Sequence, residues 1–487
     1  MNLTDILDET RNALGGVAAF ASDLVEPTVR LGVTGLSNSG KTIFVTSLVR
    51  NLIERAPMPA FDVNGEGRLE RVYLRPQPDD HVPRFDYERH LATMLEERNW
   101  PQSTRRISQL RLTFEFDPVG FWGRNIRGGI LNVDLVDYPG EWLLDLPLLN
   151  WTYAEWSARS LESVKRPPRS GLAREWRDFT ANLTRTSADD ETDARQAAKL
   201  FTTYLKACRE EQFSLSALPP GRFLMPGDLE GSPALTFAPL PQEFNQADKR
   251  RSLYAMMERR YESYKSVVVK PFFRDHFARL DRQIVLVDAL SALNAGPDAL
   301  RDLESALTDI LRCFRPGKNS WLSSVLNRRV ERILVAATKA DHLHRESHDR
   351  LEAIARRLTQ SAIERAEFSG AKVRAMAMAS VRATQEAKAD YDGEMLNCII
   401  GRPLAGEQIG KKTFSGEEDT AIFPGDLPKD PDKAIESGWT VSSDEEAEMR
   451  FIRFRPPEPK QGVAGSLYLP HIRLDRAINF LIGDKFN

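Results

Sequence analysis

The residues from Gly35 to Thr42, with the sequence GLSNSGKT, have the types and spacing of a loop that binds phosphate. Glycines at both ends let the backbone curl so that successive N–H groups converge on phosphate oxygens. Lys41 can reach the β- and γ-phosphates of a nucleotide, and the Thr42 hydroxyl can ligate Mg²⁺. The residues predicted to contact the nucleotide in this loop are Gly35, Ser37, Asn38, Ser39, Gly40, Lys41 and Thr42.

The sequence on either side of this loop predicts the elements that would hold it in place. An apolar run from Val29 to Thr34 is typical of a buried strand, and a helix is predicted from Lys41 to Ile53. Such a helix presents the positive end of its dipole to the anion. A strand before the motif and a helix after it are the context that a phosphate-binding loop requires.

A second motif, Asp137 to Gly140, follows a predicted hairpin. Its strands are expected at Ser108 to Phe116, where polar and apolar residues alternate, and at Ile130 to Asp137. In a P-loop protein an acidic residue at this place holds Mg²⁺, and the glycine that follows offers its N–H to the γ-phosphate. Asp-x-Pro-Gly is also an ordinary turn sequence, so the motif alone leaves that alternative open.

A third motif, Thr338 to Asp341, fits the pattern that selects guanine, and it follows a predicted strand at Ile333 to Ala337. The carboxylate of Asp341 can accept two hydrogen bonds from N1 and N2 of guanine, which adenine does not offer. The stem of Lys339 can pack along the base. A solvated, charged turn after a strand is the alternative. Thr338, Lys339 and Asp341 are therefore predicted to bind the base.

The segment between residues 56 and 106 is too long for a simple connection, so it is expected to contain a switch. Thr104 precedes the next strand, where its hydroxyl can complete the Mg²⁺ shell when a γ-phosphate is present. A threonine that only starts a strand is the alternative. Arg98, Arg105 and Arg106 are candidates for an arginine supplied in cis to the phosphates.

The order of these motifs resembles that of the translation-factor-like GTPases, since a predicted strand at Lys372 to Met378 follows them and leads into Ala-Ser. The whole chain resembles the YcjX family of bacterial P-loop proteins associated with stress responses. The residues 137–142, DYPGEW, and 221–227, GRFLMPG, carry this resemblance. It implies a cytoplasmic protein that binds and hydrolyses GTP, with Ser380 and Val381 at the nucleotide and an unidentified protein partner.

The hydrolytic chemistry is expected at Lys41, Gly140 and Glu141. Glu141 stands where GTPases of this type often have the glutamine that positions the attacking water. Its carboxylate can orient water, but it would also stand near phosphate oxygens, and like charges at short range disfavour ionisation or push the side chain away. We therefore expect slow hydrolysis that depends on Lys41 more than on Glu141.

The spacing of the motifs predicts an inserted domain. About two hundred residues separate Asp137 from Thr338, whereas a minimal G domain, built from strand–helix–strand units, places these two motifs about sixty residues apart. The predicted fold class is α/β, with a mostly parallel sheet of the P-loop, G-protein-like type, an inserted helical domain and a small strand-containing C-terminal appendage.

The chain is predicted to divide into five parts. The first three are an N-terminal helix packing on the G domain (1–26), the first part of the G domain with the P-loop and switches (27–142), and the inserted helical domain (143–280). The last two are the second part of the G domain with the guanine motif (281–390), and the appendage with a terminal helix that packs back on the G domain (391–487). The aromatic residues expected in the core of the insert are Trp151, Tyr153, Trp156 and Trp176.

Charge and cysteine content argue against several other classes. The 67 basic and 70 acidic residues give a net charge of −3, so specific binding of nucleic acid is not expected. The three cysteines lie far apart without a C-x-x-C pair, which favours neither a disulfide framework nor a zinc site and fits a reducing cytoplasm. The sequence contains no run of 18 apolar residues, which is the pattern that predicts a membrane span. Integral membrane association is therefore not expected.

Two functions remain in competition. The first is a GTPase that slowly hydrolyses GTP to GDP and phosphate with Mg²⁺ and acts as a nucleotide-dependent conformational switch. The second is a nucleotide-stabilised scaffold or chaperone-like protein with negligible turnover, which Glu141 in place of glutamine favours. A third, an ATP-dependent phosphotransferase, is weaker because no acceptor-binding motif is recognisable.

Overall fold

The structure is a computed structural model of the chain. It describes residues 26–36, 38–102, 106–119, 129–183, 190–210, 212–241, 252–314, 330–368, 370–391, 394–409, 412–437, 452–462 and 465–487. The N-terminal helix predicted for residues 1–26 lies outside these ranges except for its last residue. Ser37 and Thr104 also lie outside them.

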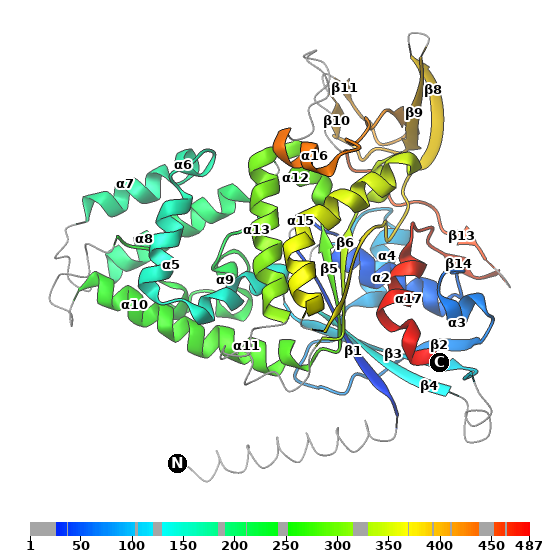
Figure 1. The fold of residues 1–487 in the computed structure, drawn as a ribbon, viewed down its shortest axis with the longest axis horizontal. Helices are drawn as coiled ribbons and strands as arrows, with labels where there is room; N and C mark the ends of the chain where they lie inside the picture. Colours follow the sequence, from blue (N-terminus) through cyan, green and yellow to red (C-terminus); the bar gives the residue numbers. More distant parts are fainter. Residues whose placement is uncertain are drawn as a thin grey trace.

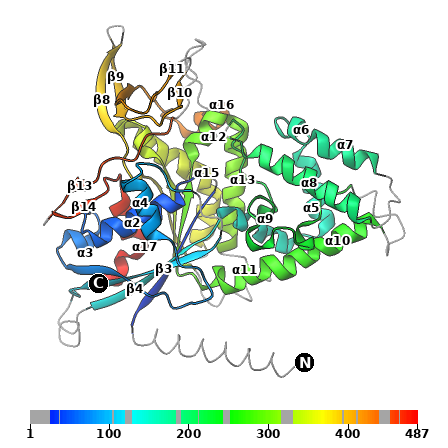
Figure 2. The same ribbon diagram turned by 180° about the vertical axis from the view of Figure 1, so that it is seen from behind.

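A seven-stranded sheet forms the centre of the molecule (Figure 1, and from behind in Figure 2), with the order β2-β3-β4-β1-β5-β6-β7. Its strands span Leu69–Arg75 (β2), Ser108–Phe116 (β3), Gly129–Asp137 (β4), Thr28–Gly35 (β1), Arg282–Val287 (β5), Arg332–Ala337 (β6) and Lys372–Ala377 (β7). From β4 to β7 the neighbouring strands run parallel, whereas β2, β3 and β4 pair antiparallel. β3 and β4 pair as the predicted hairpin strands, with Ser108 opposite Asp137 and Phe116 opposite Gly129.

Helices cover both faces of this sheet, as they do in parallel sheets generally. The covering helices span Lys41–Ile53 (α2), Asp62–Gly65 (α3), Tyr87–Leu95 (α4) and Leu474–Ile482 (α17) on one side, and Ala289–Ala295 (α12), Pro297–Phe314 (α13) and His348–Phe368 (α15) on the other. In β6, Leu334 and Ala336 belong to the cluster of α2 and α17, whereas Ile333 and Val335 belong to the cluster of α13 and α15. The α/β P-loop fold class predicted from the sequence is thereby confirmed. Among the described helices, none combines the length and the apolar character needed to cross a lipid bilayer.

The terminal helix α17 packs back on the central sheet, as predicted. Leu474, Ile478 and Leu481 are at most 1% exposed. Arg282, at the start of β5, is fully buried and donates from Nε to the carbonyl oxygen of Leu481 at 3.0 Å. Its Nη2 atom also pairs with Asp484 at 3.0 Å. The buried arginine therefore joins the middle of the chain to its last helix.

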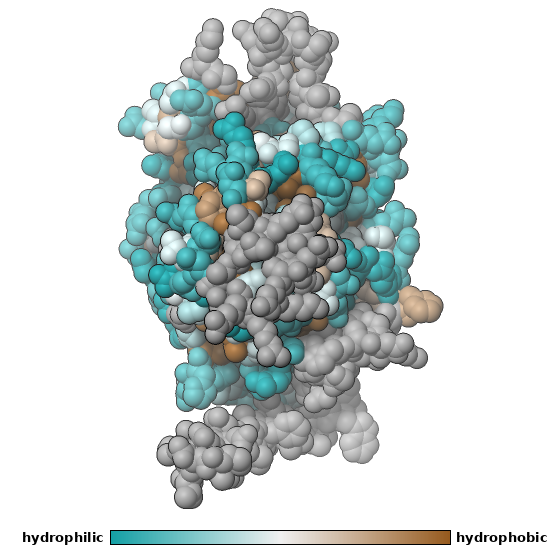
Figure 3. Space-filling model, turned by 90° about the vertical axis from the view of Figure 1, so that its left-hand side faces the viewer, coloured by the Kyte–Doolittle hydropathy of each residue, from teal (hydrophilic) through white to brown (hydrophobic). Residues whose placement is uncertain are grey.

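The residues between β4 and β5 form a group of helices beside the sheet (Figure 1). They span Gly140–Asn150 (η1), Tyr153–Ser163 (α5), Arg169–Leu172 (α6), Arg174–Asn182 (α7), Glu191–Cys208 (α8), Gly221–Leu224 (α9), Gly227–Leu229 (η2), Pro233–Leu235 (η3), Leu253–Tyr264 (α10), Lys265–Val269 (η5), Lys270–Asp275 (α11) and Phe277–Arg279 (η6). We call the residues from α5 to η6 the insert. Tyr153, Trp156 and Trp176 are buried in its core, as predicted, whereas Trp151 is only half-buried. The described surface at this end of the molecule is accordingly mostly hydrophilic (Figure 3).

The chain beyond β7 adds small strand pairs and short helices. They span Gln385–Tyr391 (β8), Glu394–Gly401 (β9), Gln408–Ile409 (β10), Lys412–Thr413 (β11), Thr420–Ile422 (β12), Pro431–Ser437 (α16), Lys460–Gln461 (β13), Leu467–Tyr468 (β14) and Gly483–Phe486 (η10). In Figure 1, β8 to β11 and α16 lie together above the sheet, whereas β13 and β14 lie beside α2 and α3. β12, β9 and β8 form one antiparallel sheet. We call the residues from β8 to β13 the appendage. The exact bounds of the domains stay a prediction.

A buried carboxyl group ties η1 to the helices of the insert. Asp145, in η1, accepts hydrogen bonds from the backbone N–H of Gly221 at 2.6 Å and from the hydroxyl of Tyr264 at 2.5 Å. Its side chain has almost no contact with solvent. Burial raises the pKa of Asp145 to about 7, although its hydrogen bonds to Tyr264 and Gly221 oppose the rise.

The raised pKa of Asp145 is expected to make the stability of the protein depend on pH. Because an unfolded aspartate has a pKa near about 3.9, the folded state binds more protons than the unfolded state between about pH 4 and pH 7. The free energy of unfolding should therefore fall as pH rises through this window and level off above it. Asp145→Asn should remove this fall, whereas Asp178→Asn, at an exposed position of α7, should keep it. Denaturant titrations across the window measure it, and identical pH profiles for wild type and Asp145→Asn would contradict the expectation.

Candidate nucleotide-binding site

The phosphate loop turns between β1 and α2. β1 ends at Gly35, and α2 begins at Lys41. Gly40 has a φ of 82° and Asn38 a φ of 58°, which are left-handed conformations that glycine and asparagine tolerate best. A Cβ atom at Gly35 would lie only 2.1 Å from Oγ of Ser39. It would also lie 2.8 Å from the backbone carbonyl oxygen of Leu286 in β5, so the close approach of β5 requires glycine at position 35.

The start of α2 is suited to an anion. Its N-cap is Gly40, which has no side chain to accept the first N–H groups, and the first turn carries no acidic residue. These N–H groups and the positive end of the helix dipole can therefore serve a phosphate. Nζ of Lys41 donates back along the loop to the carbonyl oxygen of Gly35 at 3.4 Å. Thr42, the next residue, is 5% exposed.

The Asp137 motif packs directly against this loop. Asp137 is the last residue of β4 and lies beside Val33 of β1. A Cβ atom at Gly140 would lie 2.2 Å from the carbonyl oxygen of Gly35, so the two glycines are in close backbone contact. Gly140 is thereby held next to the phosphate loop, where its N–H group is expected to meet a phosphate.

The residues predicted to hold Mg²⁺ have suitable chemistry. Thr42 and Asp137 are both buried and supply a hydroxyl and a carboxylate, and Mg²⁺ prefers such oxygen ligands. Within the described ranges, no three His, Cys, Asp or Glu side chains gather around one point. The ion would therefore complete its shell with water and phosphate oxygens, as Mg²⁺ usually does at nucleotide sites. Thr104, the third predicted ligand, lies outside the described residues.

The guanine motif follows β6 at the same edge of the sheet, and Ala340–His342 forms a short turn of helix (η7). Asp341 is 5% exposed. Its Oδ2 atom accepts a hydrogen bond from the backbone N–H of Ala383 at 3.0 Å, and its carbonyl oxygen accepts one from the Thr384 hydroxyl. These bonds fix the carboxyl group in place while it lines the cavity described below.

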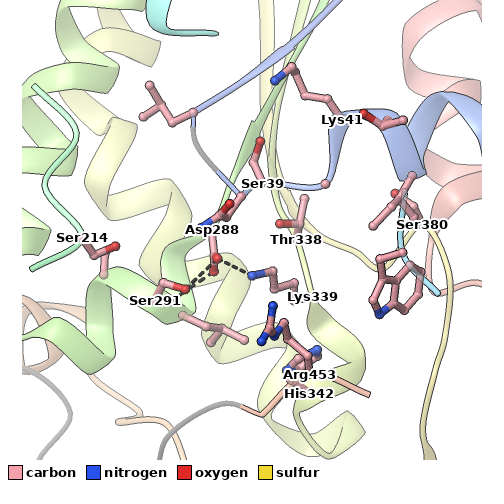
Figure 4. Close-up of a pocket in the computed structure, with 18 of the residues that line it drawn as sticks. Ser39, Lys41, Ser214, Asp288, Ser291, Thr338, Lys339, His342, Ser380 and Arg453 are labelled. Atoms are coloured by element: carbon pink, nitrogen blue, oxygen red, sulfur yellow. Dashed lines mark hydrogen bonds and ion pairs between the residues drawn. The ribbon is translucent and has the colours of Figure 1, made fainter. Parts of the chain in front are cut away.

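Lys339 is held beside Asp341 by a second carboxylate, Asp288, which follows β5 (Figure 4). Asp288 also accepts hydrogen bonds from the backbone N–H and the hydroxyl of Ser291, at 3.1 and 2.6 Å. Burial alone would raise the pKa of Asp288, but the Lys339 ammonium and Ser291 outweigh it and hold the pKa below its usual range. Lys339 has a φ of 61°, a left-handed conformation that directs the chain from β6 into η7.

One cavity of about 450 Å³ connects the phosphate loop with the guanine motif. The predicted site residues that line it are Asn38, Ser39, Gly40, Lys41, Thr42, Glu141, Thr338, Lys339, Asp341, Ser380 and Val381. In Figure 4, Ser380 and Asp288 lie on opposite sides of Thr338, and Lys41 lies above it. Gly35, Asp137 and Gly140 do not line the cavity. Gly35 and Gly140 contact each other beside it, and Asp137 lies at the end of the neighbouring strand.

Residues that sequence reasoning did not select complete the lining. Arg209 comes from the insert, Trp100 from the segment after α4, and Arg453 and Phe454 from the appendage. Nε1 of Trp100 donates to the carbonyl oxygen of Phe454 at 2.6 Å, which joins two of these segments. Asp288 also lines the cavity. Its place directly after a buried strand is a signal that could have found it, because ligands bind at the carboxyl ends of parallel strands.

The predicted arginines that the structure describes, Arg98 and Arg106, do not line this cavity. Nε of Arg98 donates to the carbonyl oxygen of Pro456 at 3.0 Å, and its guanidinium pairs with Glu458 at 3.2 Å. Arg106 is exposed, and Arg105 lies outside the described residues. Among the described lining residues the arginines are Arg209 and Arg453.

Comparisons with known proteins agree with these motifs. The model of a family described as "YcjX-like family, DUF463" matches residues 29–486. The chain is 36% identical over 474 residues to a protein of Escherichia coli strain K12 named Ras-like GTPase YcjX, covering 95% of this chain and 96% of the relative. It is 34% identical over 480 residues to the protein of the same name from Shewanella oneidensis strain MR-1, covering 94% of each chain.

Proposed function

The chain belongs to the YcjX-like family, and on that premise we propose that it binds GTP and hydrolyses it slowly to GDP and phosphate. The observation that carries the proposal is the single cavity lined both by the phosphate loop and by Thr338, Lys339 and Asp341. A phosphate loop alone would suit any nucleoside triphosphate. A buried carboxylate at the other end of the same cavity supports guanine, because only guanine offers it two donors.

In the proposed complex, the residues of the loop bind and neutralise the phosphates. Lys41 and the first N–H groups of α2 face the β- and γ-phosphates, and Gly140 offers its N–H to the γ-phosphate. Thr42 and Asp137 would hold Mg²⁺, which supplies further positive charge to the phosphates. Phosphoryl transfer depends mainly on positioning and charge stabilisation, so these residues account for binding and for a slow basal rate.

We further propose that the protein works as a nucleotide-dependent switch. The insert and the appendage both contribute residues to the cavity, through Arg209 and through Arg453 and Phe454. The presence or loss of a γ-phosphate would therefore change contacts in both. A bacterial stress response, a cytoplasmic location and a protein partner complete the proposal on the basis of the family resemblance.

Wild-type protein is expected to prefer GTP over ATP by at least about a hundredfold in affinity, because adenine leaves the buried Asp341 carboxylate without its two donors. Calorimetric titration with each nucleotide in the presence of Mg²⁺ measures this preference. Phosphate release, followed in parallel, should be slow with GTP and slower still with ATP. Equal affinity for the two nucleotides would overturn the guanine assignment, although the phosphate loop would still stand.

A nucleotide-stabilised scaffold with negligible turnover is the second candidate. It is favoured by the ion pair of Glu141 with Arg209, which engages the residue at the water-positioning place. The two candidates differ in one measurement. A protein whose melting temperature rises with GTP, but which releases no phosphate over hours, would be the scaffold and not the GTPase.

A further inference from the structure

An arginine of the insert meets the residue that follows the Asp137 motif. Arg209 directly follows α8, and its Nη2 atom donates to Oε1 of Glu141 at 2.9 Å. The side chain of Glu141 is 4% exposed and that of Arg209 is 21% exposed. Both residues line the cavity that Ser39 and Lys41 also line. The ion pair therefore joins the insert to the phosphate end of the site.

The backbone on which Glu141 sits has little freedom to move. A Cβ atom at Gly221 would lie 1.7 Å from the carbonyl oxygen of Glu141, and one at Gly140 would lie 2.2 Å from the carbonyl oxygen of Gly35. The backbone of residues 140–141 is thus enclosed between the phosphate loop and the insert. A change in charge at the phosphate site must therefore be accommodated by side chains, and the Glu141 carboxylate is one of them.

A γ-phosphate bound beside Gly140 would act in opposite directions on the two members of the pair. It would repel the carboxylate of Glu141 and attract the guanidinium of Arg209. The planar guanidinium matches the oxygens of a phosphate as well as those of a carboxylate, so Arg209 can exchange one partner for the other.

The segment that carries Arg209 is anchored on the sheet side of the cavity. Asp302, in α13, accepts hydrogen bonds from the backbone N–H groups of Ser216 at 2.5 Å and Ala217 at 2.7 Å. It also pairs with Arg169 of α6 at 2.5 Å. The chain that follows Arg209 is therefore held against α13, and only its long side chain needs to move to reach a phosphate.

The other described arginine of the cavity is engaged elsewhere. Arg453 pairs with Glu407 at 2.6 Å, within the appendage. In Figure 4 it lies beside His342, which belongs to the turn that follows Lys339. Arg453 is therefore placed at the base end of the cavity, and Arg209 remains the candidate for the phosphate end.

We propose that Arg209 is a catalytic residue that supplies, in cis, the positive charge that stabilises the transferred phosphoryl group. Glu141 is a positioning residue, which holds the guanidinium when no γ-phosphate is present. The assignment rests on the proposed hydrolysis of GTP.

In that reaction a water oxygen bonds to the γ-phosphorus. The bond between the γ-phosphorus and the β,γ-bridging oxygen breaks, and its electron pair stays on GDP. One proton of the water remains on the phosphate and the other is released to solvent. Arg209 neutralises charge on the oxygens of the group in transfer.

The test is single-turnover hydrolysis of GTP by the full chain, with Mg²⁺, in Arg209→Ala, Glu141→Ala and the double variant. Arg209→Ala should slow hydrolysis by more than about tenfold, while its affinity for GDP changes by less than about threefold. Added guanidinium ion at millimolar concentration should restore part of the lost rate. The matched control is Arg195→Ala, at an exposed arginine of α8 that pairs with Glu191, and this variant should hydrolyse GTP like wild type.

The double variant separates a catalytic role from a structural one. If Arg209 acts on the phosphate, its removal should slow hydrolysis as strongly in the Glu141→Ala background as in wild type. If it acts only by holding Glu141, its removal should have no effect in that background, and the assignment is overturned. If wild-type protein hydrolyses GTP and Arg209→Ala hydrolyses it at the same rate, the assignment of Arg209 is also overturned, but the proposed function is not. Wild-type protein that hydrolyses no GTP would overturn the proposed function and this assignment together.

Discussion

Lys41→Ala is expected to abolish most of the affinity for nucleotide, the largest effect that we predict for a single substitution. The lysine is 9% exposed at the start of α2, where little water can replace its charge beside bound phosphates. Removing one partner of such a desolvated charge pair costs about 2–5 kcal/mol, which corresponds to a loss of about thirtyfold to several thousandfold. Calorimetric titration with GDP and with a non-hydrolysable GTP analogue measures the loss directly.

Folding and charge need separate controls in this experiment. Alanine is the best helix former, so α2 should persist in the variant, and thermal unfolding without nucleotide checks that it does. Lys388→Ala removes the same charge from an exposed position on β8 and should bind nucleotide like wild type. If Lys41→Ala folds and binds both nucleotides with unchanged affinity, residues 35–42 do not bind phosphate.

Asp341→Asn is expected to weaken GTP binding by about a hundredfold or more. An amide presents only one accepting oxygen, and each hydrogen bond to a charged group contributes about 1.5–3 kcal/mol, so loss of two exceeds 3 kcal/mol. The structure indicates that the variant should fold. The side-chain oxygen of asparagine can still accept the hydrogen bond that Ala383 donates to Oδ2 of Asp341.

The same substitution should improve the binding of xanthosine triphosphate. Xanthine carries a carbonyl oxygen where guanine carries its N2 amino group, and the new amide can donate to that oxygen. Competition between the two nucleotides, measured by fluorescence displacement, should therefore reverse between wild type and Asp341→Asn. Asp117→Asn, at an exposed position after β3, is the control and should keep the preference for GTP. If Asp341→Asn still prefers GTP over xanthosine triphosphate as wild type does, the base does not bind at Asp341.

The parts of the site that could be predicted from the sequence are those encoded by contiguous residues. The phosphate loop, the Asp137 motif and the guanine motif each combine a strand with a turn whose residue types have a direct physical reason. Because parallel strands end at one edge of a sheet, residues far apart in sequence such as Lys41 and Asp341 could be expected near one another. The structure places both on one cavity.

The strand β2 shows why other elements escaped prediction. Its residues, Leu69–Arg75, lie in the long segment that was expected to contain a switch. They pair with β3, but a shift of register between Leu69 and Arg71 interrupts the alternation of buried and exposed side chains. An edge strand with a bulge does not show the period of two residues by which strands are recognised.

The residues that the insert and the appendage bring to the cavity escaped prediction for a different reason. Arg209 and Glu141 are 68 positions apart, and Trp100 and Phe454 are 354 apart. No spacing rule connects such pairs, because the intervening chain folds into separate groups of elements. Asp302 of α13 holds the chain that follows Arg209, and Arg209 pairs with Glu141 beside the Asp137 motif.

The position of α17 has a consequence for the order in which the molecule can be completed during its synthesis. This helix covers the part of one face of the central sheet that β5 and β6 form, and its backbone accepts a hydrogen bond from the buried guanidinium of Arg282. The phosphate loop leaves the ribosome first and α2 follows it directly, yet the apolar residues of β5 and β6 on this face stay without their covering helix until residues 474–482 have been made. At a synthesis rate of about 5–20 residues per second, that interval lasts roughly 20 to 90 seconds. A nascent chain that stops short of α17 would leave the apolar residues of β5 and β6 exposed on this face. Chaperones would bind such a chain, or proteases would degrade it.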